Sequence, residues 1–465
     1  MNAPLRTNPF LAGNFAPVRS EDAFAHLPVE GEIPRALQGT LYRNGPNPQF
    51  EPRDPDHHWF AGDGMIHAFR FADGNVSYCN RYVRTPRWEL EHAAGQSLFG
   101  TFGNPLTSDP SVVGKDSGVA NTNIVWHAGR LLALEEGHQP FELAPESLAP
   151  RGYVPYAGRA NRFTAHPKTD PETGELVFFG YMAGEGFFSD QVAYGVVNAN
   201  GKVTRLDTFA APFSSMIHDF FVTKNYVAFP VLPLTGSLQR AMRGGPGFAW
   251  EPEKGSHVGV MRRDAGVESM RWFTTDPCYV FHPMNMWEED GRLHVHAMQY
   301  ERAPLFPDAD GKRGLDSPAR LAHWTLDLAG DSGTIARETI DDLPGEFPRF
   351  DERRAGLPYR HGWFVAATRD KSAIGFDSLA HIDFATGARV VYEFAAGDGP
   401  GEPVFVPRGM EEGDGWILSV VWRGDEDRSD LCVFEARDIA RGPVGIARLP
   451  RRVPFGFHGN WVASC

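Results

Sequence analysis

The chain has 465 residues, of which 42% are hydrophobic and 22% are charged, a composition typical of a globular protein with a large core. Its formal net charge of −14 argues against nucleic acids and anionic membrane surfaces as main partners. The four cysteines are far apart and form no CxxC pair, so a zinc ribbon or a disulfide framework is not expected and a reducing compartment fits. No signal-peptide pattern and no apolar run of roughly 20 residues is present, which predicts a cytoplasmic protein without a transmembrane segment.

Short segments rich in β-branched and aromatic residues follow one another along nearly the whole chain, and turn residues separate them. Such segments predict β-strands. Turn sequences at 72–75, 198–202 and 289–292 predict hairpins. The predicted strand segments are 39–44, 65–85, 130–136, 175–183, 221–231, 292–300, 361–368, 389–395, 415–422 and 430–436.

Helical patterns are few and short. The clearest is 237–243, and 21–26 is predicted as another short helix. Many strands without a helix-rich half indicate an all-β, closed or radially repeated architecture, and a propeller suits this length. No Pro-rich or Ser-rich linker divides the chain, so a single domain over residues 1–465 is expected.

Four of the 17 histidines stand out because each has a phenylalanine close by in the sequence. One ring nitrogen of an imidazole can bind a metal while the other donates to a neighbouring acceptor. The nucleotide and hydrolase motifs GxGxxG, Walker A, HExxH and GxSxG are absent. The four candidate ligands are His166, His218, His282 and His458.

Local patterns alone do not assemble these four residues into one site. Each taken singly is more typical of a core histidine with a backbone partner, and their spacing matches no local ligand motif. His294 and His296 would share one strand face, which is interpreted as an ordinary sheet face. His57 and His58 are expected in a loop.

Several long segments, read together with the four histidine segments and in the same order, resemble the carotenoid cleavage oxygenase family. The resemblance runs from about residue 30 to the C-terminus. It implies a seven-bladed β-propeller with helices and loops forming a dome over one face. The other segments that carry it are LYRNGPNP (41–48), HHWFAGDGMIHAFRF (57–71), VANTNIVWHAGRLLALEEG (119–137), GEFPRFDERR (345–354) and EPVFVPRG (402–409).

The resemblance also implies a non-haem iron(II) centre on the propeller axis, with the four histidines as ligands and dioxygen as a reactant. Four neutral imidazoles are suitable ligands for Fe(II) and leave its charge uncancelled. The alkene supplies the electrons, which agrees with the lack of a nicotinamide or flavin motif. By motif, the three carboxylates that accept hydrogen bonds from ligand imidazoles are Glu136, Glu346 and Glu402.

The substrate implied by the resemblance is a hydrophobic alkene, and the segment 97–112 looks closest to the bacterial branch that includes lignostilbene dioxygenases. That branch grips a phenol with a Tyr and a Lys, where this chain has Phe102 and Glu135. Because Glu135 would repel a phenolate, the sequence favours dioxygenase cleavage of an apocarotenoid to aldehyde or ketone products. Cleavage of a stilbene or phenylpropenoid is the alternative. Phe60 matches a residue that lines the substrate cleft.

Two hypotheses that assign the protein to other functional classes remain open. The first is a non-catalytic propeller that serves as a binding scaffold, which loss of a ligand histidine would favour, although all four are present. The second is a calcium-dependent hydrolase or lactonase, which would need carboxylates and amides at the axis instead of histidines. The segment 237–250 is interpreted as an ordinary surface helix and loop in preference to an apolar substrate entrance.

Overall fold

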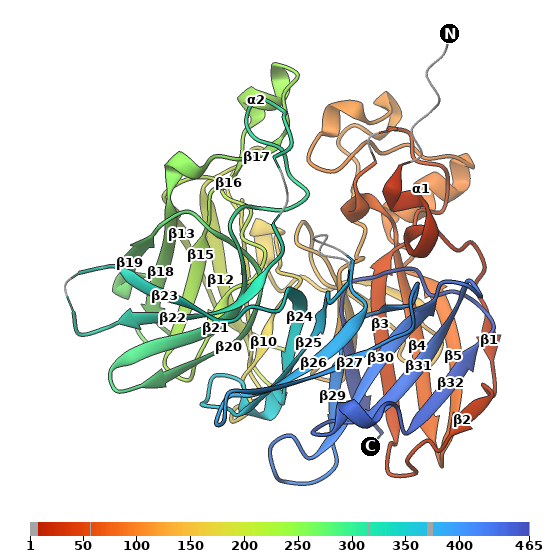
Figure 1. Ribbon diagram of the computed structural model, residues 1–465. Helices are drawn as coiled ribbons and strands as arrows, with labels where there is room; N and C mark the ends of the chain where they lie inside the picture. Colours follow the sequence, from red (N-terminus) through yellow and green to blue (C-terminus); the bar gives the residue numbers. More distant parts are fainter. Residues whose placement is uncertain (1–7, 56, 315–316, 331, 370–374, 465) are drawn as a thin grey trace.

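The computed structural model describes residues 8–55, 57–314, 317–330, 332–369 and 375–464. Within these ranges the strands form seven sheets of four or more strands, together with one small two-stranded sheet. The seven sheets are arranged as blades around a common axis (Figure 1). The predicted seven-bladed propeller is therefore confirmed. One domain over residues 1–465 stays a prediction.

Five of the blades are antiparallel sheets of four strands taken in chain order. Local hairpins of this kind need only short turns, in agreement with the turn sequences at 198–202 and 289–292. The strands of these blades are β6 (Asn123–His127), β7 (Arg130–Leu134), β8 (Phe141–Leu143) and β9 (Pro150–Tyr153); β10 (Lys168–Thr169), β11 (Leu176–Gly180), β12 (Gln191–Val197) and β13 (Val203–Ala210); β14 (Phe221–Val222), β15 (Tyr226–Val231), β18 (Ser256–Arg262) and β19 (Arg271–Thr275); β20 (Tyr279–Glu289), β21 (Arg292–Tyr300), β22 (Arg320–Asp327) and β23 (Ile335–Asp341); and β24 (Gly345–Phe350), β25 (His361–Ala366), β26 (Ser378–Asp383) and β27 (Ala388–Glu393).

The two remaining blades join the two ends of the chain and close the ring. One sheet has the order β1 (Ala23–Phe24), β5 (Asn75–Tyr82), β4 (Gly64–Ala72), β3 (Gly39–Pro46) and β33 (Gly459–Ala463), so the last strand pairs with an early one. The other has the order β2 (Val29–Gly31), β32 (Gly445–Leu449), β31 (Arg428–Glu435), β30 (Gly415–Arg423) and β28 (Gly399–Pro400), and β29 (Val404–Pro407) also pairs with β30. This closure positions the residue just before β33, which is His458.

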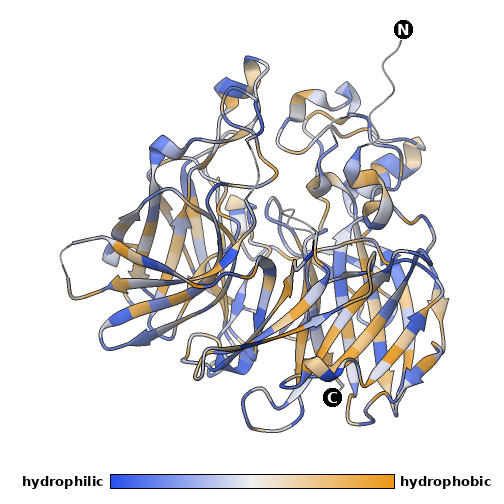
Figure 2. Ribbon diagram, in the orientation of Figure 1, coloured by the Kyte–Doolittle hydropathy of each residue, from blue (hydrophilic) through white to orange (hydrophobic). Residues whose placement is uncertain are grey.

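Within a blade, the middle strands are more deeply buried than the outer strand. All five residues of β11, in the middle of its sheet, are buried, whereas the outer strand β13 alternates between half-buried and exposed residues. Inner strands are covered on both faces by neighbouring blades, and an outer strand keeps one face in water. Figure 2 shows the apolar residues concentrated along the strands.

The helical part is small and lies mainly at one end of the propeller (Figure 1). Helix α1 (Pro86–Ala94) was not predicted from the sequence, although it has clear end signals. The Thr85 hydroxyl accepts from the Trp88 N–H, Pro86 occupies the first turn, and Gly95 ends the helix at a φ of 67°. No helix in the described ranges is long and apolar enough to cross a membrane.

Two other helix predictions have different outcomes. Helix α2 (Leu238–Met242) lies within the predicted segment 237–243. The predicted helix at 21–26 is wrong, because Ala23 and Phe24 form β1 and pair with β5. Backbone pairing with a strand distant in sequence outweighs the weak local preference of so short a segment. Helix α2 lies in the connection between the paired strands β16 (Leu234–Gly236) and β17 (Phe248–Trp250), and β17 forms the end of the segment 237–250.

Candidate metal centre and its cavity

The four candidate histidines come from four different blades, each at or just before the edge strand of its sheet. His166 precedes β10, His218 precedes β14, His282 lies in β20, and His458 precedes β33. The register of β20 against β21 shifts between Val280 and Pro283, so the backbone at His282 departs from regular pairing. Such an irregularity re-aims a side chain, here toward the axis.

The structure brings these four side chains together. One nitrogen from each lies within 4.8 Å of the others, and all four residues are buried. The His166 and His218 Nε2 atoms are 3.1 Å apart, and so are those of His218 and His282. In the described part of the chain, this is the one group in which three or more histidine, cysteine or acidic side chains converge in this way.

The three glutamates singled out from the sequence each lie beside a different imidazole. The Glu136 carboxylate lies against Nδ1 of His218. The His282 Nδ1 lies 2.5 Å from Glu346 Oε2, and the His458 Nδ1 lies 2.8 Å from Glu402 Oε1. Each carboxylate therefore fixes the orientation of one ring.

The fourth ring, His166, has a different neighbour that sequence reasoning missed. Its Nδ1 lies 3.6 Å from Oδ2 of Asp219, which is too long for a hydrogen bond. Asp219 is itself held by the Lys168 ammonium at 2.7 Å. No local pattern identifies Asp219, because it differs from any other acidic residue only by following His218.

Further contacts hold two of the glutamates in place. The Tyr181 hydroxyl donates to Glu136 Oε2 at 2.5 Å. Arg349 Nη1 lies 3.2 Å from Glu402. Burial opposes ionisation of Glu402, but Arg349 and His458 outweigh it and lower the pKa of this carboxyl to about 2. Glu402 is therefore negatively charged at neutral pH.

The protonation of the rings favours a bound cation. Nδ1 of His218 and of His282 both face carboxylates, so in the neutral rings Nδ1 carries the proton and Nε2 presents a lone pair. Two lone pairs 3.1 Å apart repel each other unless a positive charge lies between them. Burial lowers the pKa of His282 although Glu346 opposes the shift, and burial together with the neighbouring imidazoles lowers that of His166. The donor set therefore fits a transition metal that prefers imidazole ligands.

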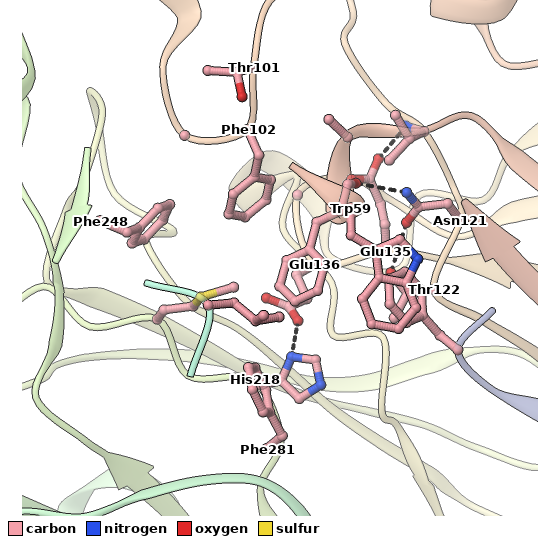
Figure 3. A pocket seen from close by; sticks show the side chains of 18 of the residues that line it. Trp59, Thr101, Phe102, Asn121, Thr122, Glu135, Glu136, His218, Phe248 and Phe281 are labelled. Atoms are coloured by element: carbon pink, nitrogen blue, oxygen red, sulfur yellow. Dashed lines mark hydrogen bonds and ion pairs between the residues drawn. The ribbon is translucent and has the colours of Figure 1, made fainter. Parts of the chain in front are cut away.

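A cavity of about 330 Å³ opens onto this centre, and His218, His282 and His458 form part of its wall. Phe60, Phe102 and Glu135 all line it. The Phe60 and Phe102 rings meet edge to face with centroids 5.4 Å apart. Figure 3 shows the Glu136 carboxylate meeting the His218 ring, with Phe281 beside that ring and with Phe102 and Phe248 across the cavity.

Among the polar residues of the wall that were not singled out from the sequence are Asn121 and His138. Asn121 donates to the carbonyl oxygens of Phe60 and Gly62 at 2.8 and 2.7 Å, and so holds the loop that carries Phe60. His138 also lines the cavity, with Nδ1 2.9 Å from Oε1 of Glu135. The partner of Glu135 could not be inferred from sequence, since two charged residues three apart in a loop have no fixed relative direction.

The other histidines lie outside the metal centre. His294 and His296 are on β21 and pack with Trp287 and His323. His57 and His58 precede a short 3-10 turn, and the His58 ring contacts Phe60 and Phe102. The axis presents imidazoles, with the carboxylates one layer behind them, and this is not the oxygen-rich cage that calcium requires.

A propeller whose axis carries four converging imidazoles, three of them backed by glutamates, defines a class of metalloprotein. Comparison with known proteins identifies the family. Residues 15–463 match the model of the retinal pigment epithelial membrane protein (RPE65) family. The chain belongs to this family, that of the carotenoid cleavage oxygenases.

Among its relatives, the isoeugenol monooxygenase of Pseudomonas putida is 39% identical, over 99% of both chains. The crystal structure of the lignostilbene dioxygenase of Pseudomonas brassicacearum superposes with a TM-score of 0.94 at 34% identity and covers 100% of both chains. A cobalt-substituted apocarotenoid oxygenase of Synechocystis has a TM-score of 0.85 at 31% identity, over 96% of this chain and 97% of the other.

Proposed function

We propose that this protein is an iron(II) oxygenase that uses dioxygen to cleave the side-chain alkene of a phenylpropene or stilbene. The observation that carries the proposal is a four-imidazole centre that opens onto a cavity with a mainly apolar wall rich in aromatic side chains. Family membership supports alkene-cleaving oxygenase chemistry, and a four-histidine site is typical of the iron centre in this family.

Iron is proposed on the basis of the family, since imidazole sets of this kind also suit zinc, copper and nickel. All four histidines are present and converge, which argues against the hypothesis of a non-catalytic binding scaffold. Bound iron(II) would supply the chemistry that activates dioxygen next to the alkene. The carboxylates of Glu136, Glu346 and Glu402 would keep the Nε2 atoms directed inward.

The choice of substrate class differs from the apocarotenoid preferred on sequence grounds. That preference depended on an isolated negative charge at Glu135, whereas the structure places His138 against it. An ion pair has no net charge, so the repulsion of a phenolate by Glu135 no longer argues against a phenolic substrate. The relatives named for isoeugenol and lignostilbene also match this chain at higher identity or TM-score than the apocarotenoid oxygenase does.

The walls of the cavity suit a flat aromatic substrate. Phe60, Phe102 and Phe248 offer ring faces and edges, and aromatic pairs in stacked or edge-to-face geometry gain about 0.5–1.5 kcal/mol beyond the burial of their area. Phe281 packs edge to face on the His218 ring with centroids 4.9 Å apart, which shields that ligand from water. These contacts would hold the alkene close to the metal and keep the site dry.

The proposal is tested with protein reconstituted anaerobically with iron(II) and then given three substrate sets in air. The sets are 4-hydroxyphenylpropenes, hydroxystilbenes and apocarotenals, and products are identified by mass spectrometry with labelled dioxygen. We expect aryl aldehydes carrying the label from the first two sets, from protein that holds about one iron per chain. Turnover of apocarotenals alone would refute the proposed substrate class, and labelled product from zinc-loaded protein would refute the role of iron.

A further inference from the structure

One residue of strand β24 has a backbone conformation that residues of its type rarely adopt. Phe347 has a φ of 52°, in the left-handed region. Among the described residues other than glycine, it is the one with a positive φ that lies inside a strand. A bulky side chain makes this conformation strained, and such strain persists only where the surrounding contacts enforce it. The conformation of Phe347 therefore needs an explanation in its neighbours.

The strand departs from regular pairing at the same point. The register of β24 against β25 shifts between Glu346 and Arg349. The two intervening residues, Phe347 and Pro348, lie opposite a single residue of β25, which is the pattern of a β-bulge. Pro348 has no N–H to give to the ladder, and proline also restricts the backbone of the residue before it. Bulges beside functional sites re-aim the groups that they carry.

The backbone of Phe347 is aimed at the carboxylate that serves a candidate metal ligand. Its N–H donates to Glu346 Oε2 at 2.5 Å, and the same oxygen lies 2.5 Å from His282 Nδ1. The other oxygen, Oε1, is buried without a hydrogen-bond partner among the described residues. Glu346 therefore depends on one backbone N–H for its orientation, whereas Glu402 is held by both Arg349 and the Gly459 N–H.

The side chain of Phe347 packs on the imidazoles themselves. Its ring stacks on that of His282 with centroids 5.2 Å apart and an angle of 25° between the planes, and it contacts the His458 ring at 5.4 Å. Phe376 and Phe455 meet it edge to face from the other directions. The ring is buried, so these contacts hold the strained backbone in place. One residue thus touches His282 directly and its carboxylate through the main chain.

We propose that Phe347 is a positioning residue of the metal centre. Its left-handed backbone fixes the Glu346 carboxylate and its ring fixes the plane of the His282 imidazole, so that His282 Nε2 faces the axis before a metal binds. This inference rests on the iron centre of the proposed function and goes further, because it assigns the local strain of β24 to the preorganisation of one ligand.

The first experiment compares Phe347→Gly with Phe347→Ala in iron-free protein. Both variants lose the ring, and they differ only by the Cβ atom. Glycine adopts a positive φ freely and alanine does not, so the glycine variant should be the more stable of the two. We expect its Tm to be about 1–2 °C higher. The reverse order would show that the Phe347 backbone is not strained and would overturn the inference.

The matched control is the same pair of substitutions at Phe364. This residue is fully buried in the neighbouring strand β25 and is not among the residues with a positive φ. In a regular strand glycine is less stable than alanine, so Phe364→Ala should melt above Phe364→Gly. Opposite orders at the two positions assign the effect to the backbone of Phe347 and not to the loss of a buried ring.

The second experiment measures iron affinity by chelator competition, because Phe347 also lines the cavity and activity alone would mix two roles. Phe347→Gly keeps the N–H donor and the left-handed φ, so Glu346 stays in place and the affinity should fall only a few-fold. In Phe347→Ala the backbone relaxes and releases Glu346, which should weaken iron binding about 10-fold or more, as for loss of an outer partner. Equal losses in the two variants would overturn the inference.

Phe347→Leu keeps a bulky buried side chain, so it tests the role of the ring even if the smaller variants do not fold. The enforced backbone should still hold Glu346, and iron affinity should fall a few-fold through the lost stacking on His282. Unchanged affinity would show that the ring does not position His282. A wild type that binds iron but cleaves neither arylalkene set would remove the proposed function and leave this inference intact.

Discussion

Two regions of the molecule bring imidazole nitrogens to the same separation of 3.1 Å. On the axis, His218 and His282 approach through their Nε2 atoms. In the blade of β24–β27, His361 on β25 and His381 on β26 approach through Nδ1 of one ring and Nε2 of the other. Both regions are buried, so neither the distance nor the burial distinguishes them.

The difference lies in where the other nitrogens point. Between two neutral rings, an Nδ1–Nε2 contact is an ordinary hydrogen bond in which one ring donates and the other accepts. On the axis, carboxylates face Nδ1 of both His218 and His282, so the inward Nε2 atoms have no proton to share. The outer carboxylates therefore turn a histidine cluster into a metal centre, and proximity of the rings alone does not.

The largest effect is expected from removing a ring on the axis. His218→Ala should lower iron to well below one per chain and abolish alkene cleavage, because one of four ligands and the partner of Glu136 are lost together. Circular dichroism should still show the β-rich fold, since the blades are held by their own cores. The control is His361→Ala, which removes a ring from the buried His361–His381 contact in the blade of β24–β27 and should leave the iron content unchanged. Full iron occupancy in His218→Ala would exclude this residue from the centre.

The next effect is expected from a carboxylate behind the axis. Glu346→Gln keeps the size of the side chain but removes the negative charge 2.5 Å from His282 Nδ1. Loss of such an outer partner typically costs 10- to 100-fold in metal affinity or activity, measurable by chelator competition. Glu412→Gln is the matched control, because Glu412 accepts a hydrogen bond from the backbone N–H of His361, next to the His361–His381 contact. Similar iron affinity in the two variants would contradict the role given to the outer carboxylates.

A smaller effect is expected at Asp219. Its Oδ2 lies 3.6 Å from His166 Nδ1, so it acts on that ring through charge alone, and Lys168 already balances much of this charge. Asp219→Asn should weaken iron binding only a few-fold, clearly less than Glu346→Gln. The same chelator competition measures it. A loss as large as that of Glu346→Gln would mean that all four rings depend equally on their carboxylates.

Many of the blade strands could be predicted from local sequence, because runs of β-branched and aromatic residues mark the strands and turn residues mark the hairpins between them. The segment 21–26 could not, because its partner strand β5 lies more than fifty residues away. The four histidines come from four blades, so spacing could not assemble them, and only the family resemblance pointed to the set. His138 and Asp219 were missed for the same reason: each matters through a neighbour that only the fold provides.

The smallest effect on iron binding, namely none, is expected at His381, whose ring responds instead to acidic pH. Burial, with the nearby His361, lowers the pKa of His381 to about 4, whereas an unfolded histidine titrates near its ordinary value of 6.5. Between these two pKa values, His381 is protonated in the unfolded chain but stays neutral in the folded protein. The stability contributed by neutral His381 is therefore complete above pH 6.5 and falls as the pH drops toward 4.

For His381, this linkage amounts to about 2 kcal/mol in the free energy of unfolding between pH 7 and pH 5. His381→Gln cannot take up the proton. Its stability, measured by urea unfolding at the two pH values, should therefore fall by about 2 kcal/mol less than that of the wild type, while its iron content at pH 7 stays unchanged. An identical fall in both proteins would show that His381 is not kept neutral by the fold. Loss of iron from His381→Gln would contradict the comparison, because it would show that iron binding on the axis depends on the His361–His381 contact.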